Sequence, residues 1–380
     1  MNMEILFYTS GILCIYSYFL YPLILILIPA KKELQLVLQE DNELPTLSLI
    51  VAVHNEEGRI REKLENTLQI DYPKESLEIV IASDFSTDAT DSIIESYADK
   101  GIQLVRADKR KGKEYAQLCA IKATKGDIIV FSDVATNIPS DALRLLTKYF
   151  TDERVGAVSS EDQLISSDGQ IVGEGAYVKY EMWLRRQESV HAGLVGLSGS
   201  FFAARREVCK EWDIATCSDF NTGRNCAKNG MVAISCPDII GIYKDIKDPD
   251  LEYRRKIRTV VRGITAIAHH PEVLNPFNMG MFSFQLWSHK IMRWGVPWFM
   301  LFFAIATLIQ QGQGMIYTLA LIAQTIFYGI AIAGWLSLKM RENAVVRIIF
   351  FFVQTNLALA QATLMFLFGK RMTVWSPSQR

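Results

Sequence analysis

Two long stretches without a charged residue frame the chain, and a segment of mixed polarity separates them. The first stretch runs from Ile5 to Ile28, and the second runs from Gly295 to Leu338. A helix needs about 20 predominantly apolar residues to cross the hydrocarbon core of a bilayer. The pattern therefore predicts membrane helices at both ends of the chain, with a globular region between them.

The C-terminal part is predicted to contain several helices. Phe277–Trp298 is rich in aromatic residues and carries a few basic ones, which is typical of a helix lying in the membrane interface. The alternative is that this segment is the polar start of the next span. Further spans are expected at Gly295–Ile309, Met315–Leu338 and Val345–Phe368, one of which could instead be re-entrant. We therefore divide the chain into four parts: a membrane anchor and linker at 1–44, a globular domain at 45–272, an interfacial amphipathic helix at 273–294, and a transmembrane bundle with a tail at 295–380.

Lys31 and Lys32 follow the first apolar stretch. Basic residues next to a membrane helix favour the cytosolic side, so the globular domain is expected in the cytosol. The first residues, MNME, lack the basic start of a signal peptide, which favours an anchor that is retained.

Within the globular domain, short apolar segments alternate with helical patterns. Strands are predicted at Leu47–Val53, Leu77–Ala82, Ile102–Val105 and Ile128–Phe131, with helical segments between them. This alternation predicts an α/β domain with a parallel sheet and right-handed crossovers. Ligands of such sheets bind at the carboxyl ends of the strands.

The loops that follow these four strands carry complementary charges. Asp84 and Asp133 supply carboxylates, and the segment Arg106–Lys113 supplies five basic side chains. Carboxylates suit ribose hydroxyls or a divalent metal ion, and cations suit a diphosphate. A G-x-G-x-x-G motif does not follow the first strand and a G-x-x-x-x-G-K-[ST] motif does not occur, which disfavours a nicotinamide site and a P-loop.

Net charge and cysteine spacing exclude other classes. The formal net charge is −1, so bulk charge indicates no nucleic-acid partner. The six cysteines form no C-x-x-C pair and have no histidine at zinc-finger spacing, which disfavours a structural zinc site.

Several segments between Pro45 and Trp294 resemble glycosyltransferase family 2, in its membrane-bound, bacterial, polysaccharide-synthesising form. They follow the order that the family has, and they read SLIVAVHNEEGRI, EIVIASDFSTDATDSI, KGKEYAQLCAI, IIVFSDVAT, YEMWLRRQES, GLSGSFFAARREV, the pair Ser218-Asp219, and RRKIRTVVRG. The resemblance implies a nucleotide-sugar-binding GT-A fold with a doubly wound mixed sheet.

The resemblance also implies roles for individual residues. Asp219 would be the general base, and Asp133 would be the acid beside a Mg²⁺ or Mn²⁺ ion. Gly199 and Ser200 would lie on the acceptor side. The remaining residues would bind the nucleotide sugar: Ala52, His54, Glu56, Asp84, Lys113 and Arg258, with Asp84 on the base or ribose and with Lys113 and Arg258 at the diphosphate. Asp219 could instead only cap the helix that follows it.

Two departures from the family pattern affect these expectations. Ala135 stands where the second acid of the D-x-D motif would be, which Mg²⁺ tolerates because substrate phosphates supply further ligands. Arg255 and Thr259 replace the glutamine and the tryptophan of the Q-x-x-R-W motif. The second departure makes a long-chain processive synthase a weaker expectation.

The sequence thus predicts an inverting glycosyltransferase at the cytosolic face of a bacterial inner or plasma membrane. The donor would be a nucleoside-diphosphate sugar, with a UDP-sugar as the first choice. The acceptor would be a lipid-linked sugar or a growing glycan, reached among membrane lipids. Two alternatives stay open: a processive polysaccharide synthase coupled to export, and a non-catalytic subunit of polysaccharide assembly.

Overall fold

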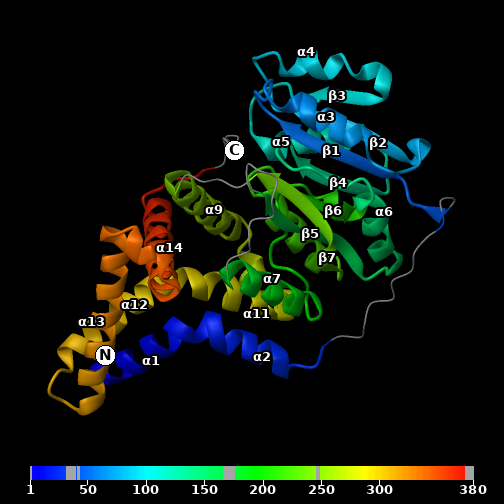
Figure 1. Cartoon of the computed structure of the whole chain (residues 1–380). Coiled ribbons are helices and arrows are strands. Elements are labelled where there is room, and N and C mark those ends of the chain that lie inside the picture. The colour runs from blue at the N-terminus through cyan, green and yellow to red at the C-terminus, as the bar shows by residue number, and fades with distance from the viewer. Residues whose placement is uncertain (1, 31–39, 41–42, 166–175, 245–248, 373–380) are drawn as a thin grey trace. The chain divides into compact units, whose positions relative to one another are not determined.

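The computed structural model describes residues 2–30, 40, 43–165, 176–244 and 249–372 (Figure 1). The predictions that rest on Lys31, Lys32 and the end of the basic tail lie outside these residues. The chain divides into two compact units. We call them the helical unit (the described residues of 1–27, 248–264 and 285–371) and the α/β unit (those of 28–247, 265–284 and 372).

The α/β unit contains a seven-stranded mixed sheet in the order β3-β2-β1-β4-β6-β5-β7. Strands β1 to β4 are parallel, β6 is antiparallel to β4 and β5, and β5 pairs in parallel with β7. The strands are β1 Leu47–Val53, β2 Leu77–Ser83, β3 Ile102–Arg106, β4 Ile128–Asp133, β5 Val155–Ile165, β6 Phe201–Arg205 and β7 Val232–Lys244. The predicted doubly wound mixed sheet is confirmed.

Helices cover both faces of this sheet, because side chains alternate between the two faces along each strand. Leu49 of β1 packs in one buried cluster with Leu64, whereas the neighbouring Ile50 packs in another with Ala116. The helices of this unit are α3 Ile60–Leu68, α4 Thr90–Glu95, α5 Lys113–Ala123, α6 Ala142–Thr147, α7 Ala176–Ser189, α8 Ser218–Lys228 and α10 Pro276–Met279. The clusters place α3, α4 and α6 on one face and α5 and α8 on the other.

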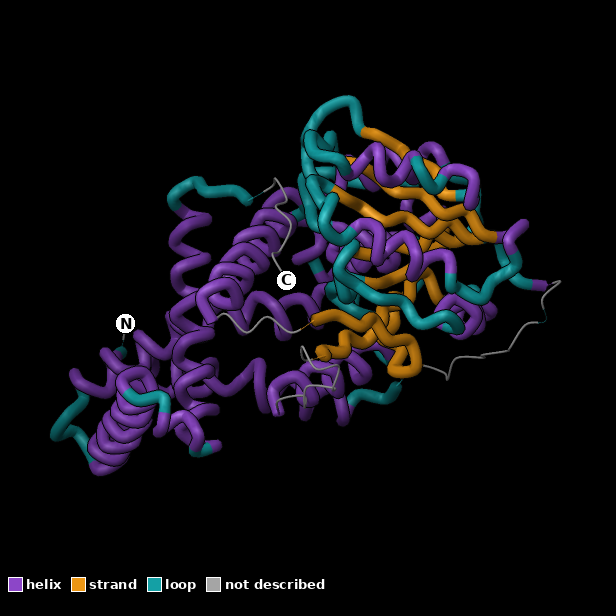
Figure 2. The backbone as a smooth tube through the Cα atoms, turned by 45° about the horizontal axis from the view of Figure 1, so that its top comes forward, coloured by secondary structure: helices purple, strands orange, loops and turns teal. Residues whose placement is uncertain are grey.

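The helical unit holds most of the residues of the four helices that are long and apolar enough to cross a membrane. Figure 2 shows the helices in purple and the strands in orange. The four runs are Met3–Leu27, Met281–Ile309, Met315–Leu336 and Ala344–Leu367. The first run comprises α1 Met3–Ile15 and α2 Tyr21–Leu27. The second run comprises α11 Met281–Leu286 and α12 Met292–Ile309. The third run is α13, and the fourth is α14. Helix α9, Pro249–His269, belongs partly to each unit.

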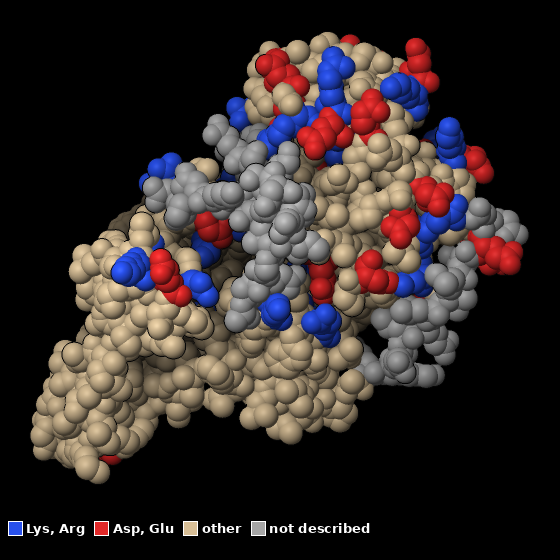
Figure 3. All heavy atoms as spheres, viewed as in Figure 1, with Lys and Arg blue, Asp and Glu red and all other residues tan. Residues whose placement is uncertain are grey.

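The helix from Met281 to Ile309 runs without a break across residues 294 and 295. The expected interfacial helix and the expected first C-terminal span therefore share one continuous helix in this region. Outward-facing positions of the next helix, α13, are apolar, since Leu319, Ile322 and Ile326 are each more than half exposed. Charged side chains are frequent over the α/β unit and sparse over the helices in Figure 3. Extended apolar surface of this kind is typical of contact with lipid.

Two of the long helices contain a π-helical turn where they touch. One turn spans Tyr16–Leu20 and the other spans Trp287–Ile291. The hydroxyl groups of Tyr16 and Ser288 lie 2.9 Å apart, within hydrogen-bond distance. The two irregular turns therefore face each other inside the helical unit.

Candidate functional site

The loops after β1 and β2 are joined through a buried histidine. Val53 and Ser83 are paired in the parallel ladder, so the two loops leave the sheet side by side. His54 follows β1 directly, and its Nδ1 atom lies 2.8 Å from the backbone carbonyl oxygen of Asp84. Both side chains are buried. The sheet thus brings together two residues that the sequence predicts at the nucleotide site.

The carboxylate of Asp84 fixes the start of the basic loop. Its Oδ1 atom accepts hydrogen bonds from the backbone amides of Lys111 and Gly112, both at 3.0 Å, and its Oδ2 atom accepts from Gly112 at 3.0 Å. Gly112 has a φ of 102°, a conformation that L side chains rarely adopt. Asp84 therefore orients the loop that delivers Lys113, whether or not it also contacts a nucleotide.

Glu56 is buried and paired in the same region. Arg59 donates two hydrogen bonds to its carboxylate from Nη2, at 2.9 and 2.7 Å, and the backbone amide of Glu56 donates to Thr90 Oγ1 at 2.8 Å. Burial raises the pKa of Glu56, and the Arg59 guanidinium opposes this shift. Glu56 thus ties the loop after β1 to the start of α4.

Phe85 adds an aromatic surface beside Asp84. It adopts a φ of 57°, which is an outlier for an aromatic residue, and 38% of its surface is exposed. The guanidinium of Arg106 lies 4.7 Å from the centre of its ring. Strained backbone of this kind is concentrated at functional sites.

Lys113 connects the loop after β4 with the loop before β6. Its ammonium group donates hydrogen bonds to Asp133 Oδ1 at 2.5 Å and to the Gly199 carbonyl at 2.9 Å. The backbone amide of Asp133 also donates to the Ser200 carbonyl, at 2.9 Å. Four of the residues predicted for the site, Lys113, Asp133, Gly199 and Ser200, are therefore in direct contact.

A lysine that the sequence analysis did not single out lies beneath this point. Lys63 of α3 is 2% exposed, and its ammonium group donates to Ser132 Oγ at 2.8 Å and to the Thr136 carbonyl at 2.5 Å. Burial lowers the pKa of Lys63 to about 7, and the nearby Asp133 carboxylate opposes the shift. Lys63 thus holds both ends of the turn that presents Asp133. The sequence signal that could have identified Lys63 is its place among the apolar residues of α3.

Asp219 lies in the first turn of α8, and the N-cap position belongs to Cys217. No side-chain hydrogen bond caps this helix. Among the residues that the structure describes, none forms a hydrogen bond or an ion pair with the Asp219 carboxylate. Asp219 is half-buried, and its backbone carbonyl lies 3.5 Å from the amide of Leu197. The carboxylate does not act as the helix cap and stays available for chemistry.

One short segment, Leu197–Ser200, links these groups. Leu197 contacts the first turn of α8, Gly199 accepts the bond from Lys113, and Ser200 accepts the bond from Asp133. The segment therefore lies between the candidate base on one side and the candidate diphosphate and metal residues on the other. A group bound along it would be within reach of both.

Two predicted residues contribute in other ways. Ala52 is 2% exposed, and in β1 it pairs with Ala82 of β2 and Asp133 of β4, so it could contribute to a site mainly through its backbone. Arg258 lies on the part of α9 that belongs to the helical unit, separate from the unit that holds the other residues. Its predicted contact with a diphosphate stays a prediction.

The carboxylates available to a metal ion are few. The described part of the chain contains no group of three or more histidine, cysteine, aspartate or glutamate side chains that could hold a metal ion. Asp133 is partly exposed at 30%, and Ala135 offers no second carboxylate two residues later. This donor set fits Mg²⁺ or Mn²⁺ held by one carboxylate together with substrate phosphates, and it does not fit an ion caged by protein alone.

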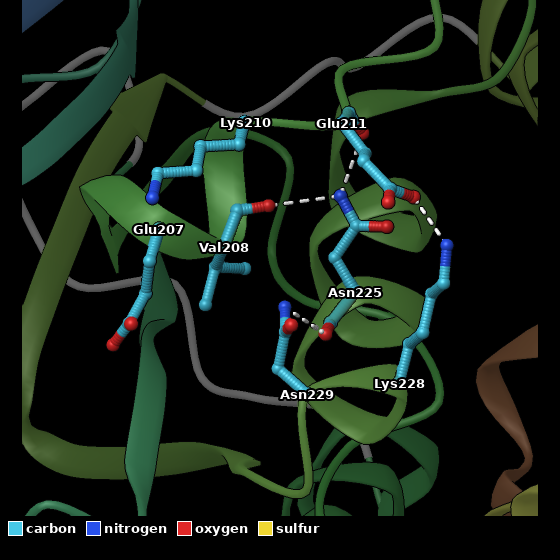
Figure 4. Close-up of a pocket in the computed structure, with 7 residues that line it drawn as sticks. All are labelled: Glu207, Val208, Lys210, Glu211, Asn225, Lys228 and Asn229. Carbon is cyan, nitrogen blue, oxygen red and sulfur yellow. Dashed lines mark hydrogen bonds and ion pairs between the residues drawn. The ribbon is translucent and has the colours of Figure 1, made fainter.

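A separate pocket lies at the other end of α8 (Figure 4). Asn225 donates to the carbonyls of Val208 and Glu211 there, both at 2.8 Å, and Lys228 pairs with Glu211 at 2.5 Å. Helix geometry places Lys228 about 14 Å along the axis from Asp219. Asn225, Lys228 and Glu211 are thus bonded within this pocket, and the pocket contains none of the predicted site residues.

The comparisons with known proteins agree with this arrangement. Residues 48–213 match the family model described as "Glycosyl transferase family 2". A β-monoglucosyldiacylglycerol synthase of Nostoc sp. is 30% identical over 198 residues, covering 50% of this chain and 41% of the relative. A poly-β-1,6-N-acetyl-D-glucosamine synthase of Staphylococcus epidermidis is 25% identical over 190 residues, covering 48% of this chain and 45% of the relative. The matched region of this chain thus spans less than half the length of each of these curated relatives.

A solved structure extends the likeness of fold to nearly the whole chain. The mannosyltransferase PcManGT from Pyrobaculum calidifontis, determined with GDP-Man and Mn²⁺, superposes with a TM-score of 0.73 at 22% sequence identity. The superposition covers 97% of this chain and 100% of that chain. The sheet order and this superposition agree on the GT-A fold, residues 48–213 match the model of glycosyltransferase family 2, and the described part of the chain also contains helices long and apolar enough to span a membrane.

Proposed function

We propose that this protein is an inverting, membrane-bound glycosyltransferase. It transfers a sugar from a nucleoside-diphosphate sugar, with a UDP-sugar as the first choice, to a lipid-linked or polysaccharide acceptor at the cytosolic face of the membrane. The observation that carries the proposal is the Leu197–Ser200 segment, which has Asp219 on one side and Lys113 with Asp133 on the other. The Asp219 carboxylate has no partner among the described residues. The acceptor class is supported by the two relatives, one a glucosyldiacylglycerol synthase and the other a poly-N-acetylglucosamine synthase.

In this proposal the residues divide the reaction between them. Asp219 removes the proton of the acceptor hydroxyl as that hydroxyl attacks the anomeric carbon. Lys113 stabilises the negative charge that develops on the leaving diphosphate. Asp133 would hold a Mg²⁺ or Mn²⁺ ion together with the diphosphate, and the ion would supply further charge stabilisation there. One displacement forms the new glycosidic bond, releases the nucleoside diphosphate and inverts the anomeric centre.

The Asp219 carboxylate makes the test direct, because no residue in the described part of the chain pairs with it. Membranes containing the protein are incubated with labelled nucleotide sugars and Mg²⁺ or Mn²⁺, and incorporation into lipid or polymer is measured. We expect transfer from one donor, and a loss of about 10²- to 10⁴-fold in the Asp219→Asn variant, the range for removal of a general base.

Asp141→Asn is the matched control, since Asp141 also stands at the start of a helix without a side-chain capping bond. It should transfer at the normal rate. Normal transfer by Asp219→Asn would exclude the assigned base. Absence of transfer from every donor by the wild-type protein would favour a non-catalytic assembly subunit, for which Ala135 is the motivating feature.

A further inference from the structure

A carboxylate and two serine hydroxyls form a compact polar cluster next to the candidate diphosphate residues. Asp162 of β5 accepts hydrogen bonds on Oδ1 from Ser198 Oγ at 2.5 Å and from Ser200 Oγ at 2.7 Å. The two hydroxyl oxygens are themselves 2.8 Å apart. Ser198 and Ser200 are buried, with exposed fractions of 4% and 8%. All three residues belong to the α/β unit.

The other oxygen of this carboxylate has no partner among the residues that the structure describes. Within the described ranges, no donor and no cation contacts Oδ2 of Asp162, and the side chain is half-buried. A carboxylate offers about four acceptor positions on its two oxygens, and burying one without partners costs free energy. The cluster is therefore oriented by two serines on one side and open to a hydrogen-bond donor on the other.

Gly199, between the two serines, leaves space beside the cluster. A Cβ atom built at Gly199 would meet no heavy atom within 4 Å, and its backbone does not adopt the left-handed conformation. Neither packing nor backbone geometry therefore demands glycine at this position. The carbonyl of the same residue accepts the hydrogen bond from Lys113. Open space thus lies next to the groups proposed for the diphosphate.

We propose that Asp162, Ser198 and Ser200 bind hydroxyl groups of the sugar that the nucleotide donor carries. This gives Ser200 a donor-side role in place of the acceptor-side role that the resemblance implies. The inference rests on the proposed function, because it assumes a diphosphate at Lys113 and Asp133. The sugar is the next group along the donor, and the Leu197–Ser200 segment continues from these residues toward Asp219. A sugar hydroxyl donates to Asp162 Oδ2, and a second hydroxyl exchanges a hydrogen bond with a serine. Asp162 is thus assigned to recognition of the donor sugar.

The test compares ligands that differ only by the sugar. The purified full chain is titrated by calorimetry, in the presence of Mn²⁺, with UDP and GDP and with UDP-glucose, UDP-N-acetylglucosamine and GDP-mannose. For the Asp162→Asn variant we expect nucleoside-diphosphate affinity within about twofold of wild type, and a loss of roughly tenfold or more in affinity for the preferred nucleotide sugar. A loss of that size is typical of one hydrogen bond to a charged group.

Asp127→Asn provides the matched control. The carboxylate of Asp127 also accepts a hydroxyl hydrogen bond, from Thr46 at 2.6 Å, but it precedes β4 at the opposite end of the parallel strands. This variant should bind every ligand as the wild type does. Gly199→Ala is a second probe, because its methyl group enters open space. It should keep the melting temperature and lose affinity for the nucleotide sugar.

The outcomes separate this inference from the proposed function. If wild type transfers sugar and Asp162→Asn loses equal affinity for diphosphate and sugar nucleotide, or loses none, the sugar assignment is overturned and the transferase remains. If wild type binds no nucleotide at all, both are overturned.

Discussion

Lys63 lies on the apolar side of α3, between Ile60 and Leu64, although it carries a positive charge. Its ammonium group reaches the turn after β4 and donates to Ser132 and to the Thr136 carbonyl. A charge is costly to bury unless it is paired or hydrogen-bonded. Burying Lys63 therefore lowers the stability of the fold somewhat, and its hydrogen bonds fix the position of the turn that carries Asp133.

This cost should depend on pH. The pKa of Lys63 is lowered by burial from its ordinary 10.5 to about 7, so between these values the unfolded chain binds a proton that the folded chain does not. The contribution of Lys63 to the free energy of unfolding therefore rises with pH across that window, by up to about 1.4 kcal/mol per pH unit. Below the window this contribution is constant. We expect the difference in melting temperature, wild type minus Lys63→Met, to increase from pH 7 to pH 9 in detergent.

Lys122→Met is the control for this measurement, because Lys122 is exposed on α5. Its melting-temperature difference from wild type should not change over the same range. A difference for Lys63→Met that stays flat or decreases as the pH rises would contradict a lowered pKa.

Among individual residues, the sequence predicted those site residues that stand at the ends of parallel strands. His54, Asp84 and Asp133 stand at strand ends, and the pairing of β1 with β2 and β4 brings their loops together. Asp162 could not be predicted in the same way, because it lies within β5 and meets Ser198 and Ser200 in the segment just before β6. Contacts of this kind depend on the register of pairing, which alternation of short apolar segments does not specify.

Among the elements, α8 is positioned by an unusually close contact. A Cβ atom at Gly223 would lie 2.9 Å from the backbone carbonyl oxygen of Leu194, closer than real Cβ contacts allow. Gly223 is buried one turn after Asp219, and Leu194 lies just before the segment that contacts Asp219. The small residue thus lets the helix approach the segment that connects the base with the diphosphate residues.

Gly223→Ala should therefore move α8 away from this segment and displace Asp219. We expect transfer to fall by about 10²-fold, the effect of a displacement of about 1 Å at a reacting group. Nucleoside-diphosphate affinity, measured by calorimetry, should stay near the wild-type value because Lys113 and Asp133 are not on α8.

Gly329→Ala is the matched control, since it places the same methyl group on a helix where no heavy atom lies within 4 Å. That variant should transfer sugar normally. Unchanged transfer by Gly223→Ala would show that the close contact does not position the base.

Prediction of the elements themselves was uneven for a physical reason. The first four strands match predicted apolar segments within two residues at each end, because each is a short segment rich in apolar residues between polar loops. The long pair β5 and β7 was not predicted. Their ladder shifts register between Ser160 and Glu161, where the partner residue jumps from Cys236 to Ile240. Such an irregularity interrupts the period of two on which strand recognition depends.

The whole molecule combines a unit of ordinary polarity with helices whose outward residues are apolar. Four helices in the described part of the chain reach spanning length, and at most 28% of the residues in the most apolar stretch of each are buried. Washing membranes with sodium carbonate at high pH should therefore leave the chain in the pellet. Recovery of the chain in the supernatant would exclude integral insertion.

Orientation can be tested on the same membranes. We expect trypsin to cut the α/β unit in inverted vesicles and to leave it intact in whole cells, because the donor nucleotides proposed for the site are cytosolic. The fragments are followed with an antibody to a tag on the α/β unit. Cleavage in whole cells would place this unit outside.

The facing π turns at Tyr16–Leu20 and Trp287–Ile291 also bear on how the chain can change length during evolution. A π turn accommodates one residue more than an α-helical turn. Deleting one residue from either turn would restore an α-helical turn there and leave the rest of that helix in its present register. A single-residue change at either turn would therefore keep the packed side of its helix facing inward, so the two helices can change length independently of each other.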